Sequence, residues 1–153
     1  GGIFFNSNKA IRECNQERMY MIKTSFKMFQ SSPIQGIGAG EYVVKVADFP
    51  LFSDKVLYQP VHNVFCLILA EMGIVGILCM GFLFRRYFIF KLPRTFMEWG
   101  AVGAVMALIF IANCDHYLLT FPEGRVLTAV VFSWYALEFH FARLKFFESS
   151  SPK

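Results

Sequence analysis

The sequence predicts an all-α fold, a fragment of a polytopic membrane helical bundle with a helical region outside the membrane. Three observations predict it. Hydrophobic residues make up 56% of the chain. Charged residues make up only 17%, against about 25% in an average soluble domain. The apolar residues gather in three long runs in the second half of the chain, and such runs are typical of transmembrane helices.

The polar segment 1–62 is predicted to contain an amphipathic helix over about residues 9–30. At about 100° per residue, one apolar line on it runs through Arg18, Ile22, Ser25 and Phe29, with Met19 and Phe26 beside it. The opposite, solvated face carries Lys23, Lys27 and Arg12. Arg18 therefore lies on or beside the apolar stripe, where an unpaired charge is costly. Two interpretations stay open: a paired or snorkelling structural cation, and a functional charge.

A glycine-rich stretch, SSPIQGIGAGEY, follows this helix at residues 31–42. Glycine-rich turns can place backbone N–H groups against a phosphate. Here, however, a helix and not a strand precedes the glycines, the dinucleotide spacing is absent, and no Lys-Ser/Thr follows. The pattern therefore favours a flexible turn after a helix over a nucleotide site.

Three transmembrane helices are predicted within residues 63–147, at about 63–84, 96–113 and 126–142, followed by a cytoplasmic tail at 148–153. The first would be about 33 Å long as a continuous helix, which is enough to cross a bilayer. The third is the least apolar, because Glu138 and His140 lie near its end.

Basic residues in the short loops orient these helices. The loop between the first two runs carries no acid and four bases, Arg85, Arg86, Lys91 and Arg94, and three more bases follow the third run, Arg143, Lys145 and Lys153. The loop 114–125 carries only Arg125 against two acids. Residues 1–62 and 114–125 are therefore predicted to face the periplasm or cell exterior. This topology explains the net charge of +4, and no aromatic-interleaved basic groove or zinc pattern indicates a nucleic-acid partner.

Polar residues at the predicted outer boundary are candidates for a site. His62 and Asn63 open the first run, on a face that continues to Gly73 and Gly76, where another helix could pack closely. A histidine there is ordinarily a cap or interface residue, although its charge changes readily near neutral pH. After the second run, Asp115 and His116 form either an ordinary interfacial loop or a roof over the site of Arg18 and His62.

Glu71 lies inside the first run, and an intramembrane acid is a functional-site candidate by default. About 180° of helix rotation separates it from His62, so we expect the two not to meet. We expect its partner to be structural and to lie on a helix outside this chain. The four cysteines show no metal-binding spacing, and nothing in the sequence supports a bridge between Cys14 and Cys114.

Three segments together resemble one family: ERMYMIKTSFKMFQSSPIQGIGAGEY, HNVFCLILAEMGIVGIL and DHYLLTFPEGR. They resemble the C-terminal half of proteins of the O-antigen ligase and polymerase superfamily. Members of that superfamily are bacterial polytopic glycosyltransferases. In that family an Arg-bearing helix leads to a P-x-x-G-x-G turn and then to an H-N-x-x-L-x-x-x-x-E-x-G-x-x-G helix. The matching positions are Arg18, Pro33, Gly36, Gly38, His62, Asn63, Glu71, Gly73 and Gly76, while Phe65 and Cys66 depart from the usual residues.

The resemblance covers about residues 17–137 and implies a larger protein, because family members have many more spans. The chain also begins without Met. We therefore expect a partial chain that is inactive alone, from a multi-pass protein of the bacterial inner membrane that takes part in lipopolysaccharide and other cell-envelope polysaccharide biosynthesis.

The resemblance also implies a reaction: transfer of a glycan from an undecaprenyl-diphosphate carrier to a hydroxyl of a glycan, lipid or protein acceptor. In that reaction Arg18 would stabilise the leaving diphosphate, and His62 would act as the base on the acceptor hydroxyl. Further substrate-binding candidates are Arg12, Gly36, Gly38, Asn63, Asp115 and Arg125. The resemblance implies no metal and no cofactor. Ligase, polymerase and protein O-oligosaccharyltransferase share these motifs, and a transporter or channel subunit, or an inactive membrane scaffold, stays an alternative.

Overall fold

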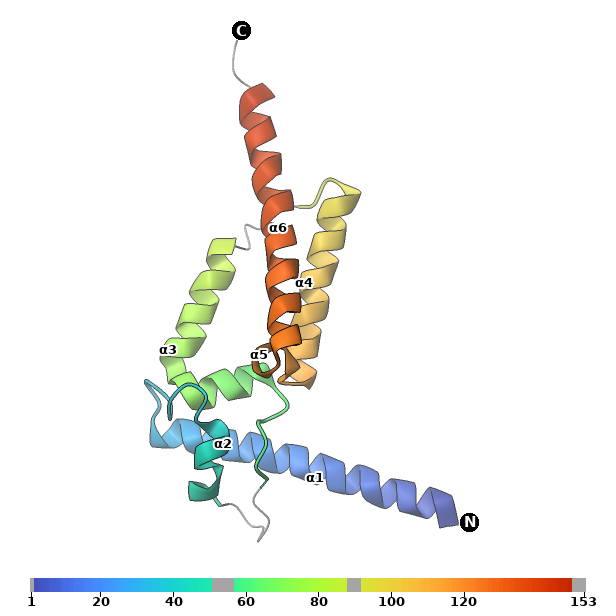
Figure 1. The fold of residues 1–153 in the computed structure, drawn as a ribbon, viewed down its shortest axis with the longest axis vertical. Coiled ribbons are helices and arrows are strands. Elements are labelled where there is room, and N and C mark those ends of the chain that lie inside the picture. The colour runs from blue at the N-terminus through green and yellow to red at the C-terminus, as the bar shows by residue number, and fades with distance from the viewer. Residues whose placement is uncertain (1, 51–56, 88–91, 150–153) are drawn as a thin grey trace. The chain divides into compact units, whose positions relative to one another are not determined.

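A computed structural model describes residues 2–50, 57–87 and 92–149, and these ranges contain helices and no strand (Figure 1). The helices are α1 (Gly2–Ser31), α2 (Tyr42–Lys45), α3 (Val64–Tyr87), α4 (Phe96–Cys114), α5 (Tyr117–Thr120) and α6 (Pro122–Ser149), with a 3-10 turn η1 (Val46–Asp48). The predicted all-α class is confirmed. The chain forms two compact units, Gly1–Met80 with Asn113–His116, and Gly81–Ala112 with Tyr117–Lys153.

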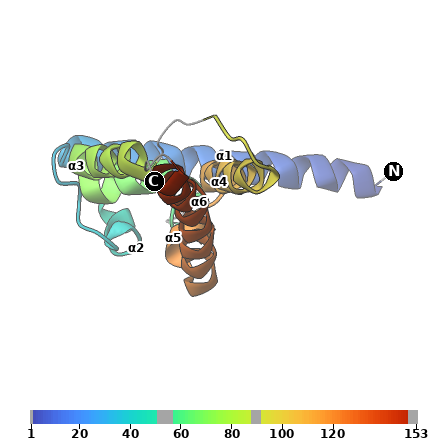
Figure 2. The same cartoon turned by 90° about the horizontal axis from the view of Figure 1, so that it is seen from above.

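The first unit packs around the C-terminal half of α1, beside which α2 and the start of α3 lie in both views (Figures 1 and 2). Its buried core consists of Met21, Met28, Tyr42, Val46, Val61, Leu67 and Ala70. The Tyr42 hydroxyl donates to the Met21 carbonyl at 3.0 Å and lies 3.3 Å from the Ser25 hydroxyl. Burial raises the pKa of Tyr42 to about 12, so the hydroxyl keeps the proton that it donates.

The apolar stripe of α1 differs from the sequence prediction. Its buried residues are Met21, Thr24, Ser25 and Met28. Met19 and Phe26, which were placed beside the stripe, are 53% and 48% exposed, and that part of the prediction is wrong. The reason is that α2 and α3 cover a face rotated away from the predicted line, and periodicity alone does not show which apolar residues meet protein.

The helix α3 is broken at Gly73, where φ is 61° and ψ is −154°. Its axis changes direction sharply at this point (Figure 1). The expectation of one continuous helix over 63–84 is therefore corrected: residues 64–72 pack in the first unit, and the helix resumes after the break. Such a break leaves backbone groups on both sides without their helical partners.

The glycine turn after α1 supplies those partners. Four backbone hydrogen bonds join it to the break, from Ile37 to Ala70 (3.0 Å), from Gly38 to Glu71 (2.9 Å), from Ile74 to Pro33 (2.9 Å) and from Val75 to Ile34 (3.2 Å), each from N–H to carbonyl. The first two bonds satisfy carbonyls before the break, and the last two satisfy amides after it. The turn therefore replaces the missing helical hydrogen bonds.

This pairing requires glycine at two positions. Gly36 and Gly73 both have positive φ, 71° and 61°. A Cβ on Gly36 would lie 2.3 Å from the carbonyl carbon of Glu71, and a Cβ on Gly73 would lie 2.6 Å from the carbonyl oxygen of Ile34. Gly73 was expected on a face that packs against another helix, but its close neighbour is the turn.

The second unit has its own core, in which Ala101 and Val105 of α4 pack with Tyr135 of α6. The start of α4 is a capping box, because the Thr95 hydroxyl accepts from the Glu98 N–H at 3.1 Å and the Glu98 carboxylate accepts from the Thr95 N–H at 3.3 Å. These reciprocal bonds explain how Glu98 is tolerated as a buried acid in an apolar helix.

Among the described residues, two helical segments are long and apolar enough to cross a membrane by length and composition, Val64–Arg85, which is broken at Gly73, and Phe96–Cys114. They coincide with the first two predicted spans. The third predicted span, 126–142, lies within α6 and stays a prediction, as does the orientation of the loops. Lys91 and residues 150–153 of the predicted tail lie outside the described residues. Cys14 and Cys114 are both free and exposed.

We predict that Gly36→Ala lowers the free energy of unfolding by roughly 2–4 kcal/mol, because the new methyl group meets backbone atoms and the residue keeps a positive φ. Gly40→Ala is the matched control: its φ is 78°, but a Cβ there meets nothing within 4 Å. It should lose only about 1–2 kcal/mol of stability. Thermal unfolding in detergent or lipid nanodiscs measures both, and equal losses would contradict the close approach.

Candidate functional site

His62, Asp115 and His116 meet in the first unit, where the chain enters α3 and where it leaves α4. The Nδ1 atom of His62 lies 3.3 Å from Oδ1 of Asp115, and Nε2 of His116 lies 3.8 Å from the same oxygen. The two imidazole rings lie with centroids 5.1 Å apart, tilted by 34°. The sequence left open whether Asp115 and His116 share a site with His62, and the structure brings all three together.

The charges in this cluster follow from its hydrogen bonds. Partial burial raises the pKa of the Asp115 carboxyl, but the hydrogen bond to His62 and the backbone hydrogen bond of His116 outweigh this effect, so the pKa lies below its usual value. Asp115 is therefore a carboxylate at neutral pH, and a carboxylate only accepts hydrogen bonds. The proton between the two groups consequently belongs to Nδ1 of His62, and in the neutral ring the lone pair then lies on Nε2.

The side chain of His116 is more buried than those of His62 and Asp115. Burial lowers the pKa of His116, against the attraction of the Asp115 carboxylate. At neutral pH its imidazole is therefore uncharged.

Asn63 fixes the geometry of the cluster. Its side-chain Nδ2 donates to the carbonyl of Asn113 at 3.1 Å, and its Oδ1 accepts from the Cys66 N–H at 2.9 Å. The second contact caps the start of α3, and the first holds that start against the end of α4. Both contacts are structural, and the predicted contact of Asn63 with substrate stays a prediction.

The predicted arginines are all exposed. Arg12 and Arg18 lie on α1, on the part of the helix that precedes its first buried residue, Met21. Arg125 is exposed near the start of α6, in the second unit. The roles predicted for the three arginines stay predictions.

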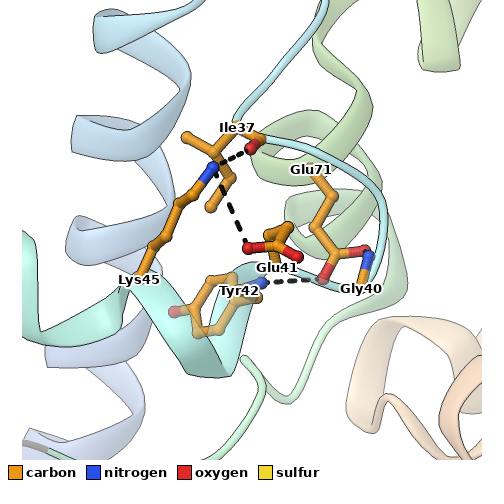
Figure 3. A network of polar contacts seen from close by, with 6 residues as sticks. All are labelled: Ile37, Gly40, Glu41, Tyr42, Lys45 and Glu71. Carbon is orange, nitrogen blue, oxygen red and sulfur yellow. Dashed lines mark hydrogen bonds and ion pairs between the residues drawn. The ribbon is translucent and has the colours of Figure 1, made fainter.

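Glu71 is held by the glycine turn (Figure 3). One carboxylate oxygen accepts from the Gly40 N–H at 2.9 Å, and the other accepts from the Tyr42 N–H at 3.1 Å. Beside it, Lys45 donates to the carbonyl of Ile37. The expectation that the partner of Glu71 lies on a helix outside this chain is therefore corrected: the partners are two backbone amides of the same unit.

The amides of Gly36 and Gly38 are also engaged within the protein. The Gly36 N–H donates to the Ser32 carbonyl at 2.9 Å, and the Gly38 N–H donates to the Glu71 carbonyl at 2.9 Å. The turn therefore does not present these two N–H groups to a phosphate. The predicted role of both glycines in substrate binding stays a prediction, and it would have to use other atoms of the turn.

Residues 6–81 match the sequence model of the O-antigen ligase family. This segment belongs to the O-antigen ligase family. It contains most of α1, the glycine turn, His62 and the broken part of α3, so it covers both the paired backbone and one member of the cluster. No curated protein and no solved structure matches the chain. Family and apolar helices together indicate a membrane protein with a function in glycosyl transfer.

One feature of the structure was not predicted from the sequence, the pairing of the glycine turn with the α3 break. It involves backbone groups separated by more than thirty residues. Periodicity within a single segment contains no signal for such a pairing.

We predict that Glu71→Gln lowers the free energy of unfolding by about 1–3 kcal/mol, because an amide group replaces one acceptor oxygen and faces a backbone N–H. Glu41→Gln is the control, because Glu41 only forms an exposed pair with Lys45 at 3.9 Å and should lose at most about 1 kcal/mol. Thermal unfolding measures both variants. An unchanged Glu71→Gln protein would show that the carboxylate does not hold the turn.

Proposed function

We propose that this O-antigen ligase family protein transfers a glycan from an undecaprenyl-diphosphate carrier to an acceptor hydroxyl, with His62 as the general base. The observation that carries the proposal is the hydrogen bond between Nδ1 of His62 and Asp115. An imidazole whose second nitrogen is held by a carboxylate is a common arrangement for general-base catalysis on a hydroxyl. The family match places His62 in the shared segment.

The proposed step follows from this tautomer. Nε2 of His62 takes the proton of the acceptor hydroxyl while the hydroxyl oxygen attacks the anomeric carbon of the glycan. The bond between that carbon and the diphosphate oxygen breaks, and the diphosphate leaves with the electron pair. The imidazolium that forms is stabilised by the carboxylate of Asp115, as in other base–carboxylate pairs.

Arg18 is proposed to bind the departing diphosphate. A guanidinium can hold two phosphate oxygens at once, and charge-assisted hydrogen bonds of this kind are strong. Its exposure on α1 keeps the side chain accessible to a substrate at the membrane surface. Further contacts to the diphosphate or glycan are proposed for five residues: Arg12, Arg125, Asn63 and the turn glycines Gly36 and Gly38.

The setting of the reaction is part of the proposal. We place the protein in the bacterial inner membrane with residues 1–62 on the periplasmic or outer side, where a lipid-linked glycan and its acceptor meet. The acceptor is a glycan, lipid or protein hydroxyl. No observation favours the transport alternative, which relies on Glu71 as a mobile intramembrane acid, because two backbone amides bind that carboxylate.

We predict that His62→Gln, in the protein expressed from its complete gene, lowers glycan transfer by about 100-fold or more, the usual contribution of a general base. Arg18→Lys keeps the charge but loses bidentate binding and should lower transfer as well. The measurement is the rate of glycan transfer from a lipid-diphosphate donor, with surface glycan as the cellular readout.

His140→Gln serves as the control, because it removes the one other histidine of the chain outside the cluster. It should keep the parental rate. Full transfer by His62→Gln would reject His62 as the base. Loss of transfer in the Glu71→Gln variant alone, with both site variants active, would favour transport.

A further inference from the structure

We infer that His62, Asp115 and His116 form a binding site for a divalent first-row transition-metal ion such as Zn²⁺. Each residue offers one ligand atom, and these three atoms all lie within 4.8 Å of one another. The cluster belongs entirely to the first unit, since residues 113–116 pack with Gly1–Met80. The binding itself does not depend on the proposed reaction.

The distances suit such an ion. Zinc binds histidine nitrogen at about 2.0–2.1 Å and carboxylate oxygen at about 2.0–2.2 Å, so two ligands of a tetrahedral ion lie roughly 3.4 Å apart. The Asp115 oxygen lies 3.3 Å from Nδ1 of His62 and 3.8 Å from Nε2 of His116. Two of the three distances between ligand atoms are therefore close to those around a zinc ion, and the third is at most 4.8 Å.

The ligand set indicates the class of ion. Two imidazoles and one carboxylate suit zinc, iron, nickel or copper, whereas magnesium and calcium prefer oxygen ligands throughout. Three protein ligands leave a fourth position for water or another small ligand. The Asp115 side chain is 48% exposed, so an ion can enter from the surrounding water.

The two segments that carry the ligands are already held together. Asn63, next to His62, donates to the carbonyl of Asn113, two residues before Asp115. This contact fixes the start of α3 against the end of α4 whether or not an ion is bound. Part of the ordering that binding needs is thus already in place, which favours affinity.

Metal binding would change the tautomer of His62, a consequence that rests on the proposed function. Without an ion, the proton of the neutral ring is on Nδ1 and the lone pair of Nε2 is free to act as the base. An ion on Nδ1 displaces that proton, and the neutral ring then carries its proton on Nε2. The base is lost, so the ion should inhibit transfer.

The binding test uses the protein expressed from its complete gene, purified in lipid nanodiscs and freed of metal with a chelator. Titration with Co²⁺ should give visible ligand-field bands that saturate at one equivalent. X-ray absorption of the Zn²⁺ form should show two imidazole ligands, a result that needs no variant. His116→Ala and Asp115→Asn should each weaken Co²⁺ binding at least about 10-fold, while His140→Gln should bind as the parent does. Absence of the bands, or equal binding by His116→Ala and the parent, would overturn the site.

Transfer measured with and without Zn²⁺ separates this inference from the proposed function. Each protein is compared with its own metal-free rate. If Zn²⁺ inhibits transfer by the parent and this inhibition is relieved in His116→Ala, the result supports both the metal site and His62 as the base. Binding without inhibition keeps the metal site and rejects His62 as the base. Loss of transfer in His62→Gln with no metal binding by the parent rejects the metal site alone.

Discussion

The first unit depends on the backbone pairing between the glycine turn and the break in α3. Breaking a helix exposes amides and carbonyls, and each buried group left unpaired costs about 1–3 kcal/mol, more where no water can reach it. The turn 33–38 satisfies two carbonyls and two amides around Gly73. Only glycine at positions 36 and 73 lets the two backbones approach this closely, and Glu71 strengthens the contact by binding the amides of Gly40 and Tyr42.

This pairing determines where His62 lies. Because residues 64–72 are held against the turn and the core of Met21, Tyr42 and Leu67, the start of α3 has a fixed direction. His62 then meets Asp115 and His116, and Asn63 ties the two segments together. The glycines therefore support the site indirectly, as part of the frame that positions an imidazole, while their own amides are used within the protein.

Much of this architecture was predictable from the sequence, because long apolar runs and helical periodicity are local signals. The all-α class followed from them. His62 and Glu71 have separate partners, as expected, although His62 lies before α3 and not on it. The break at Gly73 was not predictable in the same way, because residues 63–84 form one long, mainly apolar run and only the distant turn stabilises the break. The buried face of α1 was misplaced for a similar reason: Met19 and Phe26 are as apolar as Met21, and only the packing partners distinguish them. Of the site, the sequence identified His62 and left open whether Asp115 and His116 share a site with it, because sequence positions do not reveal which side chains converge.

Amide hydrogen exchange in lipid nanodiscs tests the central pairing most directly. The N–H groups of Ile37, Gly38, Ile74 and Val75 are all engaged in the four bonds. They should therefore exchange slowly and become unprotected together as the first unit opens. Gln35, which is exposed in the same turn and donates to none of these four bonds, should exchange fast. Fast exchange at Ile37 and Gly38 with slow exchange at Ile74 and Val75 would show a continuous helix beside a free loop and would contradict the account.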